Sequence, residues 1–300
     1  MKKKTYLFAL MAMALTLGSC SDNENGIVGE TSKYITVSTS IGNMTRVATD
    51  EKGGQTFEEG DEISVYAWTG DATIAPDASE RVVNNAINKL TNGSWVSTPQ
   101  MLWKNNRDKH YFIGVYPTAA ISDLSAGEYT FDVNKQTESD LLVAVNPDGL
   151  SYSADAQQIV PLTFTHVMAK LAVNLTYKNQ WGGIPTVEKV VVGNAAKEAT
   201  INYLTKVVTP STTAKEDFSL PEITENTKYV SVIIPQEDVK QLTIVIGGKN
   251  FVYDNGTPFK LESGKITIVN LEVGRDEIKL GDVKITNWED GSTFSGEALN

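Results

Sequence analysis

The chain has 300 residues, and its 37 acidic side chains outnumber its 26 lysines and arginines, giving a formal net charge of −11 at pH 7. An acidic surface repels phosphate backbones, so we expect no nucleic-acid partner. The single cysteine and two histidines leave the chain without a disulfide and with few side chains for a metal site, and we expect neither metal nor cofactor.

The N-terminus has the features of a bacterial lipoprotein signal. Three lysines precede an apolar run over residues 6–17, which is too short to span a bilayer, and the lone cysteine, Cys20, follows directly after the small residue Ser19. We expect cleavage between Ser19 and Cys20 and lipid attachment to Cys20. Residues 1–19 are then the signal peptide, and residues 20–30 form a polar tether. Removing the signal takes away three lysines and no acid, so the formal charge becomes −14.

No later stretch approaches the roughly 18 unbroken apolar residues that a transmembrane helix needs. The lipid on Cys20 is therefore the expected attachment to the outer membrane.

The first predicted strand follows the tether. Over residues 34–41 the side chains alternate, with Ile35, Val37, Thr39 and Ile41 on one face and polar side chains or Tyr on the other. This period of two is typical of a strand that is covered on one face only.

The same pattern recurs along the whole chain. Further strands are predicted at residues 63–68, 110–116, 162–177, 229–234, 242–246, 251–253 and 265–273. Residues 81–90 fit a strand at least as well as a short helix, because β-branched side chains precede Asn92-Gly93. Both Asn92-Gly93 and Asn255-Gly256 have the composition of hairpin turns.

Many short strands with few helical signals predict an all-β protein. Residues 178–185 contain a Gly-Pro cluster that interrupts the strands, so we divide the chain into two tandem antiparallel β-sandwich domains of about seven strands each. They span residues 31–181 and 182–300. A boundary near residues 155–160 is the alternative.

No catalytic motif is recognisable in the chain. His166 shares a predicted strand face with Leu162 and Phe164, which favours a packed histidine over a general base. The acidic groups at residues 58–61 and 289–290 leave a glycoside hydrolase as a third-ranked alternative. We predict no catalytic residue. We expect the five tryptophans to fill the cores of the sandwiches and the interface between the domains. A sugar-binding surface is the alternative.

Several segments, in order along the chain, resemble the fimbrillin family of pilus subunits. They are residues 35–46, residues 57–68 (Phe-Glu-Glu-Gly-Asp-Glu-Ile-Ser-Val-Tyr-Ala-Trp), residues 140–144, residues 164–175 with His166, and residues 285–291 with Trp288. The resemblance implies transthyretin-like sandwiches and a structural subunit of a surface pilus, or fimbria, that contributes to adhesion. It also implies a lipoprotein precursor that reaches the outer surface of the cell.

The resemblance further implies an assembly mechanism. A trypsin-like protease cuts after an arginine, here between Arg46 and Val47, and the strand containing Ile35 and Val37 leaves. A strand from another pilus subunit then takes its place. The residue pattern agrees, since loss of a one-sided strand would expose both a sheet edge and an apolar surface.

Residues 276–288 are a candidate donor segment for such an exchange. Their apolar alternation changes phase across Gly281-Asp282, which indicates a bulge or a tight hairpin. A monomeric surface lipoprotein that binds a glycan or a host protein is the second function considered, and it would not depend on cleavage at Arg46.

Overall fold

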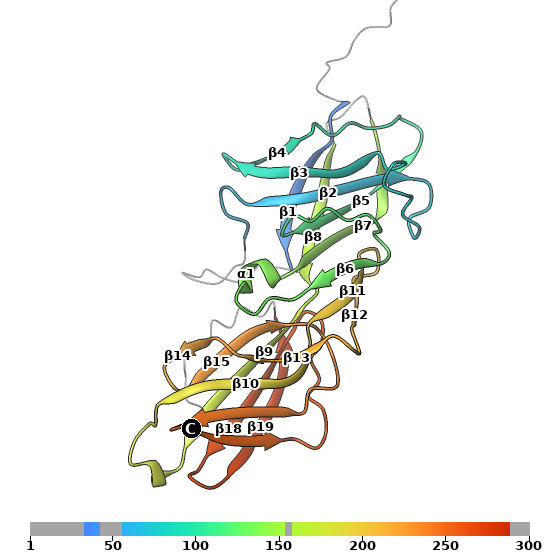
Figure 1. Cartoon of the computed structure of the whole chain (residues 1–300). Coiled ribbons are helices and arrows are strands. Elements are labelled where there is room, and N and C mark those ends of the chain that lie inside the picture. Colours follow the sequence, from blue (N-terminus) through green and yellow to red (C-terminus); the bar gives the residue numbers. More distant parts are fainter. Residues whose placement is uncertain (1–32, 43–55, 154–157, 289–300) are drawn as a thin grey trace, which may run out of the picture. The chain divides into compact units, whose positions relative to one another are not determined.

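The computed structural model describes residues 33–42, 56–153 and 158–288. These residues belong to one compact unit, Thr31–Asn300, and they form nineteen strands (Figure 1). The short helix α1 (Gln136–Ser139) and the 3-10 turn η2 (Asn179–Trp181) lie between strands. The all-β prediction is therefore confirmed. Within the described residues, no helix is both long and apolar enough to cross a bilayer.

The first sheet has seven strands. In spatial order they are β1 (Thr36–Ile41), β8 (Ile159–His166), β7 (Leu142–Ser151), β5 (Lys109–Tyr116), β2 (Glu62–Thr69), β3 (Val83–Thr91) and β4 (Ser94–Thr98). Neighbours pair antiparallel with the exception of β1 and β8, which run parallel.

The middle of this sheet is covered on both faces. Along β2, Ile63 and Val65 point into one buried cluster, whereas Tyr66 and Trp68 point into another. The first cluster is made almost entirely by side chains from this one sheet, together with Met101. A single sheet can enclose such a core only by curling, which brings its two edge strands toward each other.

Three smaller sheets contain the remaining strands. The five-stranded sheet has the order β14 (Glu222–Thr224), β15 (Lys228–Ile233), β9 (Ala169–Tyr177), β18 (Lys265–Val273), β19 (Ile278–Asn287). The four-stranded sheet has the order β13 (Lys215–Ser219), β10 (Val187–Ala196), β16 (Gln241–Ile246), β17 (Lys249–Asp254), and the three-stranded sheet the order β12 (Val207–Pro210), β11 (Glu198–Asn202), β6 (Gly127–Thr130).

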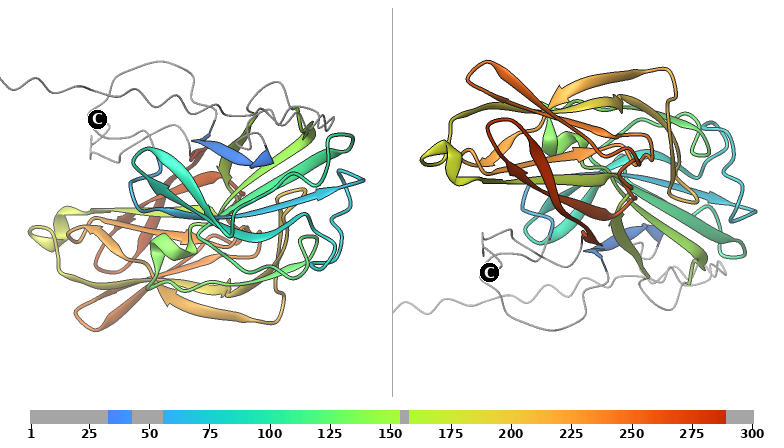
Figure 2. Two further views of the ribbon diagram at one scale, coloured as in Figure 1. Left: turned by 90° about the horizontal axis from the view of Figure 1, so that it is seen from above. Right: turned by 90° about the horizontal axis from the view of Figure 1, so that it is seen from below.

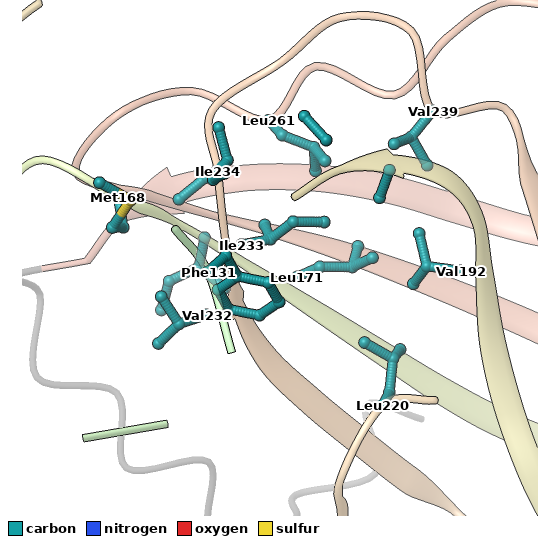
Figure 3. Close-up of a cluster of buried hydrophobic side chains, with 14 of the residues drawn as sticks. Phe131, Met168, Leu171, Val192, Leu220, Val232, Ile233, Ile234, Val239 and Leu261 are labelled. Carbon is teal, nitrogen blue, oxygen red and sulfur yellow. The ribbon is translucent and has the colours of Figure 1, made fainter. Parts of the chain in front are cut away.

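The five- and four-stranded sheets share an apolar core. Leu171 of β9 and Ile233 of β15 lie in the same buried cluster as Val192 of β10 (Figure 3). Ile244 of β16 belongs to the same cluster. Each of these four side chains is fully buried. This packing of two sheets is the sandwich arrangement that the sequence predicts.

The prediction of one continuous strand over residues 162–177 is wrong. It divides at Val167 and Met168, so that β8 belongs to the seven-stranded sheet and β9 to the five-stranded sheet. Both residues are buried, and the backbone N–H of Val167 donates to the carbonyl of Leu141 at 3.0 Å. Two consecutive buried side chains break the period of two at the point where the chain changes sheets. The two-domain division, with its boundary after Trp181, stays a proposal.

One of the two predicted hairpins is confirmed. Asn92 and Gly93 have φ values of 51° and 72° and connect β3 to β4, as a two-residue turn requires. The prediction of a hairpin at Asn255-Gly256 is wrong, because β17 ends at Asp254 and the next strand begins only at Lys265. Asn255 instead uses its side-chain amide to donate to the carbonyl of Thr257, which starts a longer loop.

Candidate functional site: the first strand and its acceptor surface

Strand β1 occupies one edge of the seven-stranded sheet (Figure 2). Its residues pair with Ile159–Phe164 of β8, with Thr36 opposite Ile159 and Ile41 opposite Phe164. The amide of Gly42 extends this ladder by donating to the carbonyl of Phe164 at 2.8 Å. These partners are more than 120 residues away along the chain, so β1 is held by distant contacts and not by a hairpin.

The predicted inward face of β1 is confirmed. Ile35 and Val37 are only 1% and 7% exposed, and Thr39 and Ile41 are half-buried. The hydroxyl of Thr39 accepts a hydrogen bond from the indole N–H of Trp95 on β4 at 3.0 Å. This contact joins the two edge strands of the sheet, so β1 closes the curled sheet.

Below β1 lies the apolar core that the curled sheet encloses. We call the part that shares a cluster with Ile35 and Val37 the acceptor surface, and it comprises Met101, Phe112, Val160, Leu162 and Phe164. All five are at most 2% exposed. Removing β1 would uncover this surface, and refilling it with a comparable strand would recover roughly 1.5–3 kcal/mol for each large apolar side chain.

Aromatic rings support the acceptor surface from the side. Phe57 packs edge-on against Phe164, Trp95 and Tyr116, with ring centroids 5.1–5.4 Å apart. Phe57 belongs to the segment that leads into β2, and edge-to-face pairs of this kind favour fixed geometry. The surface under β1 is therefore held by elements other than β1 itself.

The structure places four of the eight predicted site residues, namely Ile35, Val37, Thr39 and Ile41. Ser19, Cys20, Arg46 and Val47 lie outside the described residues. Signal cleavage, lipid attachment and proteolytic processing thus remain predictions.

At the other end of the described chain, β19 forms the edge of the five-stranded sheet. The register with β18 shifts by one residue, so that Asn270 faces Asp282 and Leu271 faces Leu280. Gly281 is the extra residue, which confirms the predicted bulge. The bulge keeps the apolar residues Ile278, Leu280, Val283 and Ile285 on the face shared with the core side of β18, although the last three are 38–39% exposed.

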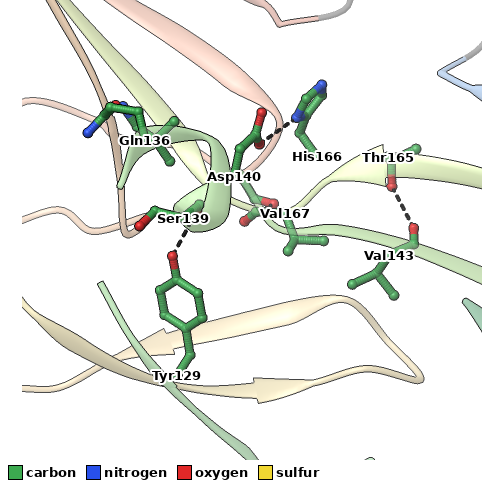
Figure 4. Close-up of polar contacts among 10 residues, drawn as sticks. Tyr129, Gln136, Ser139, Asp140, Val143, Thr165, His166 and Val167 are labelled. Atoms are coloured by element: carbon green, nitrogen blue, oxygen red, sulfur yellow. Dashed lines mark hydrogen bonds and ion pairs between the residues drawn. The ribbon is translucent and has the colours of Figure 1, made fainter. Parts of the chain in front are cut away.

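Trp288, the residue that follows β19, joins a cluster that the sequence did not predict. The ring of Trp288 stacks on His166 at 4.2 Å with an interplanar angle of 7°, and Lys170 Nζ lies 4.2 Å from the indole ring. His166 Nδ1 is 2.7 Å from a carboxylate oxygen of Asp140 (Figure 4). Burial lowers the pKa of Lys170, and the nearby carboxylate of Asp140 opposes that shift.

This cluster unites three of the segments that resemble the fimbrillin family. Asp140 precedes β7, His166 ends β8, Lys170 belongs to β9, and Trp288 follows β19. The resemblance identified the segments, but no pattern in the sequence shows that they meet. The stack fastens the end of β19 to the point where the chain passes between sheets, and it confirms His166 as a packed, hydrogen-bonded residue.

Two of the acidic residues considered for catalysis, Glu59 and Asp61, have structural contacts, and residues 289–290 lie outside the described residues. The carboxylate of Glu59 accepts hydrogen bonds from the amides of Asn92 and Gly93, and Asp61 accepts one from the amide of Glu58. These bonds stabilise two turns. Within residues 33–42, 56–153 and 158–288, no group of three histidine, cysteine or acidic residues could hold a metal ion.

A family model described as fimbrillin-like matches residues 45–288. The chain belongs to the fimbrillin-like family. A protein of Bacteroides uniformis named as fimbrium subunit Fim1C is 24% identical over 313 residues, and the alignment covers 97% of each chain.

Solved structures from the same group of bacteria share the fold of this fimbrillin-like chain. A cell adhesion protein from Bacteroides uniformis superposes with a TM-score of 0.62 at 21% identity, covering 85% of this chain and 99% of that one. A cell adhesion protein from Bacteroides ovatus also gives 0.62, at 18% identity, with 85% and 98% coverage. The tip fimbrial protein Mfa3 from Porphyromonas gingivalis gives 0.50 at 11% identity, with 77% and 95% coverage.

Proposed function

We propose that this protein is a structural subunit of a surface fimbria, which is exported as a lipoprotein and assembles by strand exchange after proteolysis. Membership of the fimbrillin-like family supports the fimbrial role, as does a relative named as a fimbrium subunit that aligns over nearly the whole chain. The observation that carries the assembly step is β1, an edge strand that closes an otherwise complete apolar core.

Export begins with the signal over residues 1–19. After cleavage, the lipid on Cys20 holds the chain at the outer membrane, and the tether over residues 20–30 separates the lipid from β1. Two or more acyl chains on one cysteine are enough for stable attachment. The subunit would thus wait at the cell surface with β1 in place.

Cleavage between Arg46 and Val47 would cut the connection between β1 and β2. Once cut, β1 is held to the rest of the protein by non-covalent contacts, chiefly its ladder with β8 and its inward side chains. Its departure exposes the acceptor surface and the backbone edge of β8, and both cost free energy in water.

A strand from another subunit would remove both costs at once, since strand addition satisfies the backbone edge and fills the side-chain positions together. The C-terminal segment is the candidate donor. In β19 the bulge at Gly281 is needed to place four apolar side chains on one face. A straight donor strand would present only two of these on each face, so donation requires either the bulge or a contribution from residues beyond Asn287.

The test uses the chain from residue 21 onward, which carries no lipid. We expect a monomer before treatment and, after trypsin, a fragment that starts at Val47 and forms multimers resistant to SDS. An Arg46→Ala variant should stay monomeric under the same treatment, whereas Arg107→Ala, which removes an exposed arginine elsewhere, should behave as the parent. Mass spectrometry identifies the N-terminus of the fragment, and gel filtration measures whether the protein is a monomer or a multimer.

A fragment that begins at Val47 and stays monomeric at high concentration would overturn the strand-exchange step. Lipid attachment is tested separately. Cys20→Ala should leave the precursor uncut or misplaced in cells, and normal surface display of that variant would refute the lipoprotein assignment.

A further inference from the structure

A hollow of about 350 Å³ lies beside the start of β1. The side chains that form it are Lys33, Trp103, Lys104, Asn105, Asn106 and Tyr152. Leu102 completes the rim and is 50% exposed. The volume is at the small end of the roughly 300–1,000 Å³ that ligand sites occupy, which suits a single sugar ring with its substituents.

Two aromatic rings supply the apolar part of this hollow. The rings of Trp103 and Tyr152 are 6.3 Å apart at an angle of 40°, so they form a tilted pair and not a closed stack. Behind Trp103, His110 and Phe112 pack edge-on at 4.9 and 5.7 Å and hold the indole in position. A fixed indole on a half-exposed surface offers an apolar face to the C–H side of a pyranose ring.

The charge of the hollow is opposite to that of the chain. Among the residues that the structure describes, its lining contains two lysines and no acidic residue, although the chain as a whole has a net charge of −11. An ammonium group forms charge-assisted hydrogen bonds with a carboxylate that are roughly twice as strong as neutral ones. The lysines thus favour an anionic ligand.

The loop that holds these groups is built by hydrogen bonds to the backbone. The amide of Lys104 donates to His110 Nε2 at 3.1 Å, and the side-chain oxygen of Asn105 accepts from the amides of Arg107 and Asp108 at 2.8 Å. Burial lowers the pKa of His110, which favours the neutral ring. Its Nδ1 lies 3.1 Å from the carbonyl of Asp108, so Nδ1 carries the proton and Nε2 accepts the bond from Lys104. The backbone of Lys104 is therefore held in place, and its ammonium group donates to the hydroxyl of Thr69 at 3.4 Å.

We propose that this hollow binds a saccharide that carries a carboxylate, such as a sialic or uronic acid. The aromatic pair contacts the sugar ring, Lys33 and Lys104 bind the carboxylate, and Asn106 is placed to bond a hydroxyl. This activity goes beyond the assembly of a fimbria and needs no cleavage of the chain.

The hollow also depends on the segment that leads into β1. The amide of Trp103 donates to the carbonyl of Lys33 at 3.2 Å, and Tyr34 forms a bridge with Leu102. Loss of residues 33–41 would remove one lysine and one wall. A bound sugar would then strengthen the attachment of β1, and attached β1 would strengthen sugar binding by the same factor. This coupling rests on the proposed function.

The experiment titrates 3′-sialyllactose, a glucuronic-acid disaccharide and lactose against the uncut chain from residue 21 onward, followed by saturation-transfer NMR and calorimetry. We expect binding of at least one acidic sugar, at least tenfold weaker binding of lactose, and weaker binding at higher salt. Lys104→Glu should lower the affinity at least tenfold. The matched control Lys109→Glu changes the same charge on a neighbouring exposed residue and should have little effect.

Trp103→Ala should also abolish binding, and Trp103→Phe, which keeps an aromatic face, should restore part of it. Acidic sugars that bind no better than lactose, or equal affinities for Lys104→Glu and Lys109→Glu, would overturn the proposal. The last measurement repeats the sugar titration on trypsin-treated protein. Sugar binding should vanish if residues 33–41 leave the protein. If no cleavage occurs, the strand-exchange mechanism fails while the result for the uncut chain still decides the sugar site.

Discussion

Placing one negative charge on either face of β1 measures how firmly this strand closes the core. Val37 points into the acceptor surface and is 7% exposed, whereas its neighbour Ser38 points outward and is exposed. Val37→Asp and Ser38→Asp therefore add the same side chain to the same strand on opposite faces. Only the first should disturb the core.

The expected cost of Val37→Asp has two parts. Losing the buried valine removes roughly 1.5–3 kcal/mol of transfer free energy. Keeping the new carboxyl neutral at pH 7, about three units above its ordinary pKa, costs about 4 kcal/mol more. The protein can limit this cost by letting β1 detach, so we expect either a free energy of unfolding lower by about 3 kcal/mol or more, or an unseated β1. Ser38→Asp should stay within about 0.5 kcal/mol of the parent.

Urea denaturation of the chain from residue 21 onward measures the first outcome, and amide hydrogen exchange along β8 measures the second. Exchange at residues 159–164 should accelerate in Val37→Asp, because these residues form the ladder with β1. Equal denaturation midpoints and equal exchange rates for the two variants would show that β1 does not close the core, and would remove the physical basis for strand replacement.

Three further predictions test the core, the C-terminal stack and a buried histidine. In Gly114→Ala the new Cβ would lie 2.6 Å from the tip of the Phe164 ring, so overpacking should cost about 1–3 kcal/mol in urea denaturation, and an unchanged midpoint would contradict this. Trp288→Ala removes the ring stacked on His166 and should lower the free energy of unfolding by about 3–5 kcal/mol, with faster amide exchange along β19; a loss below 1 kcal/mol would show that the stack does not hold the strand. Burial lowers the pKa of His110 from its ordinary 6.5, so below pH 6.5 the unfolded chain takes up a proton that the folded chain refuses, and stability should fall with pH down to the lowered pKa. His110→Gln should flatten that part of the pH profile, and an identical slope in both proteins would count against this assignment.

Much of the local structure can be predicted from the sequence, because strand periodicity is a local property. The alternation at Ile35 and Val37 correctly indicates which face of β1 is buried, and Asn92-Gly93 correctly indicates a hairpin because both residues tolerate positive φ. The phase change at Gly281 correctly indicates a bulge. The segments that resemble the fimbrillin family lie within the range that the family model matches, apart from the first, which ends at its start, and the last, which runs slightly beyond its end.

The choice of neighbours could not be predicted in this way. Period two shows which side chains share a face, but it does not show which strand lies alongside, and β1 pairs in parallel with a strand more than 120 residues away. The same limit hid the division of residues 162–177 between two sheets, since the pattern does not show that β8 and β9 pair with different strands.

The amino-acid sequence by itself thus predicted most of the strands, the buried face of β1 and the family resemblance, all of which depend on residues close together in the chain, and the export signal stays a prediction. Only the tertiary structure decided that β1 closes the core of a curled sheet, that Asp140, His166, Lys170 and Trp288 form one cluster, and that Trp103 and Lys104 line a hollow. The physical reason is that these arrangements depend on packing between segments far apart in the sequence, where many pairings satisfy the same local pattern and only the shared burial of side chains selects one of them.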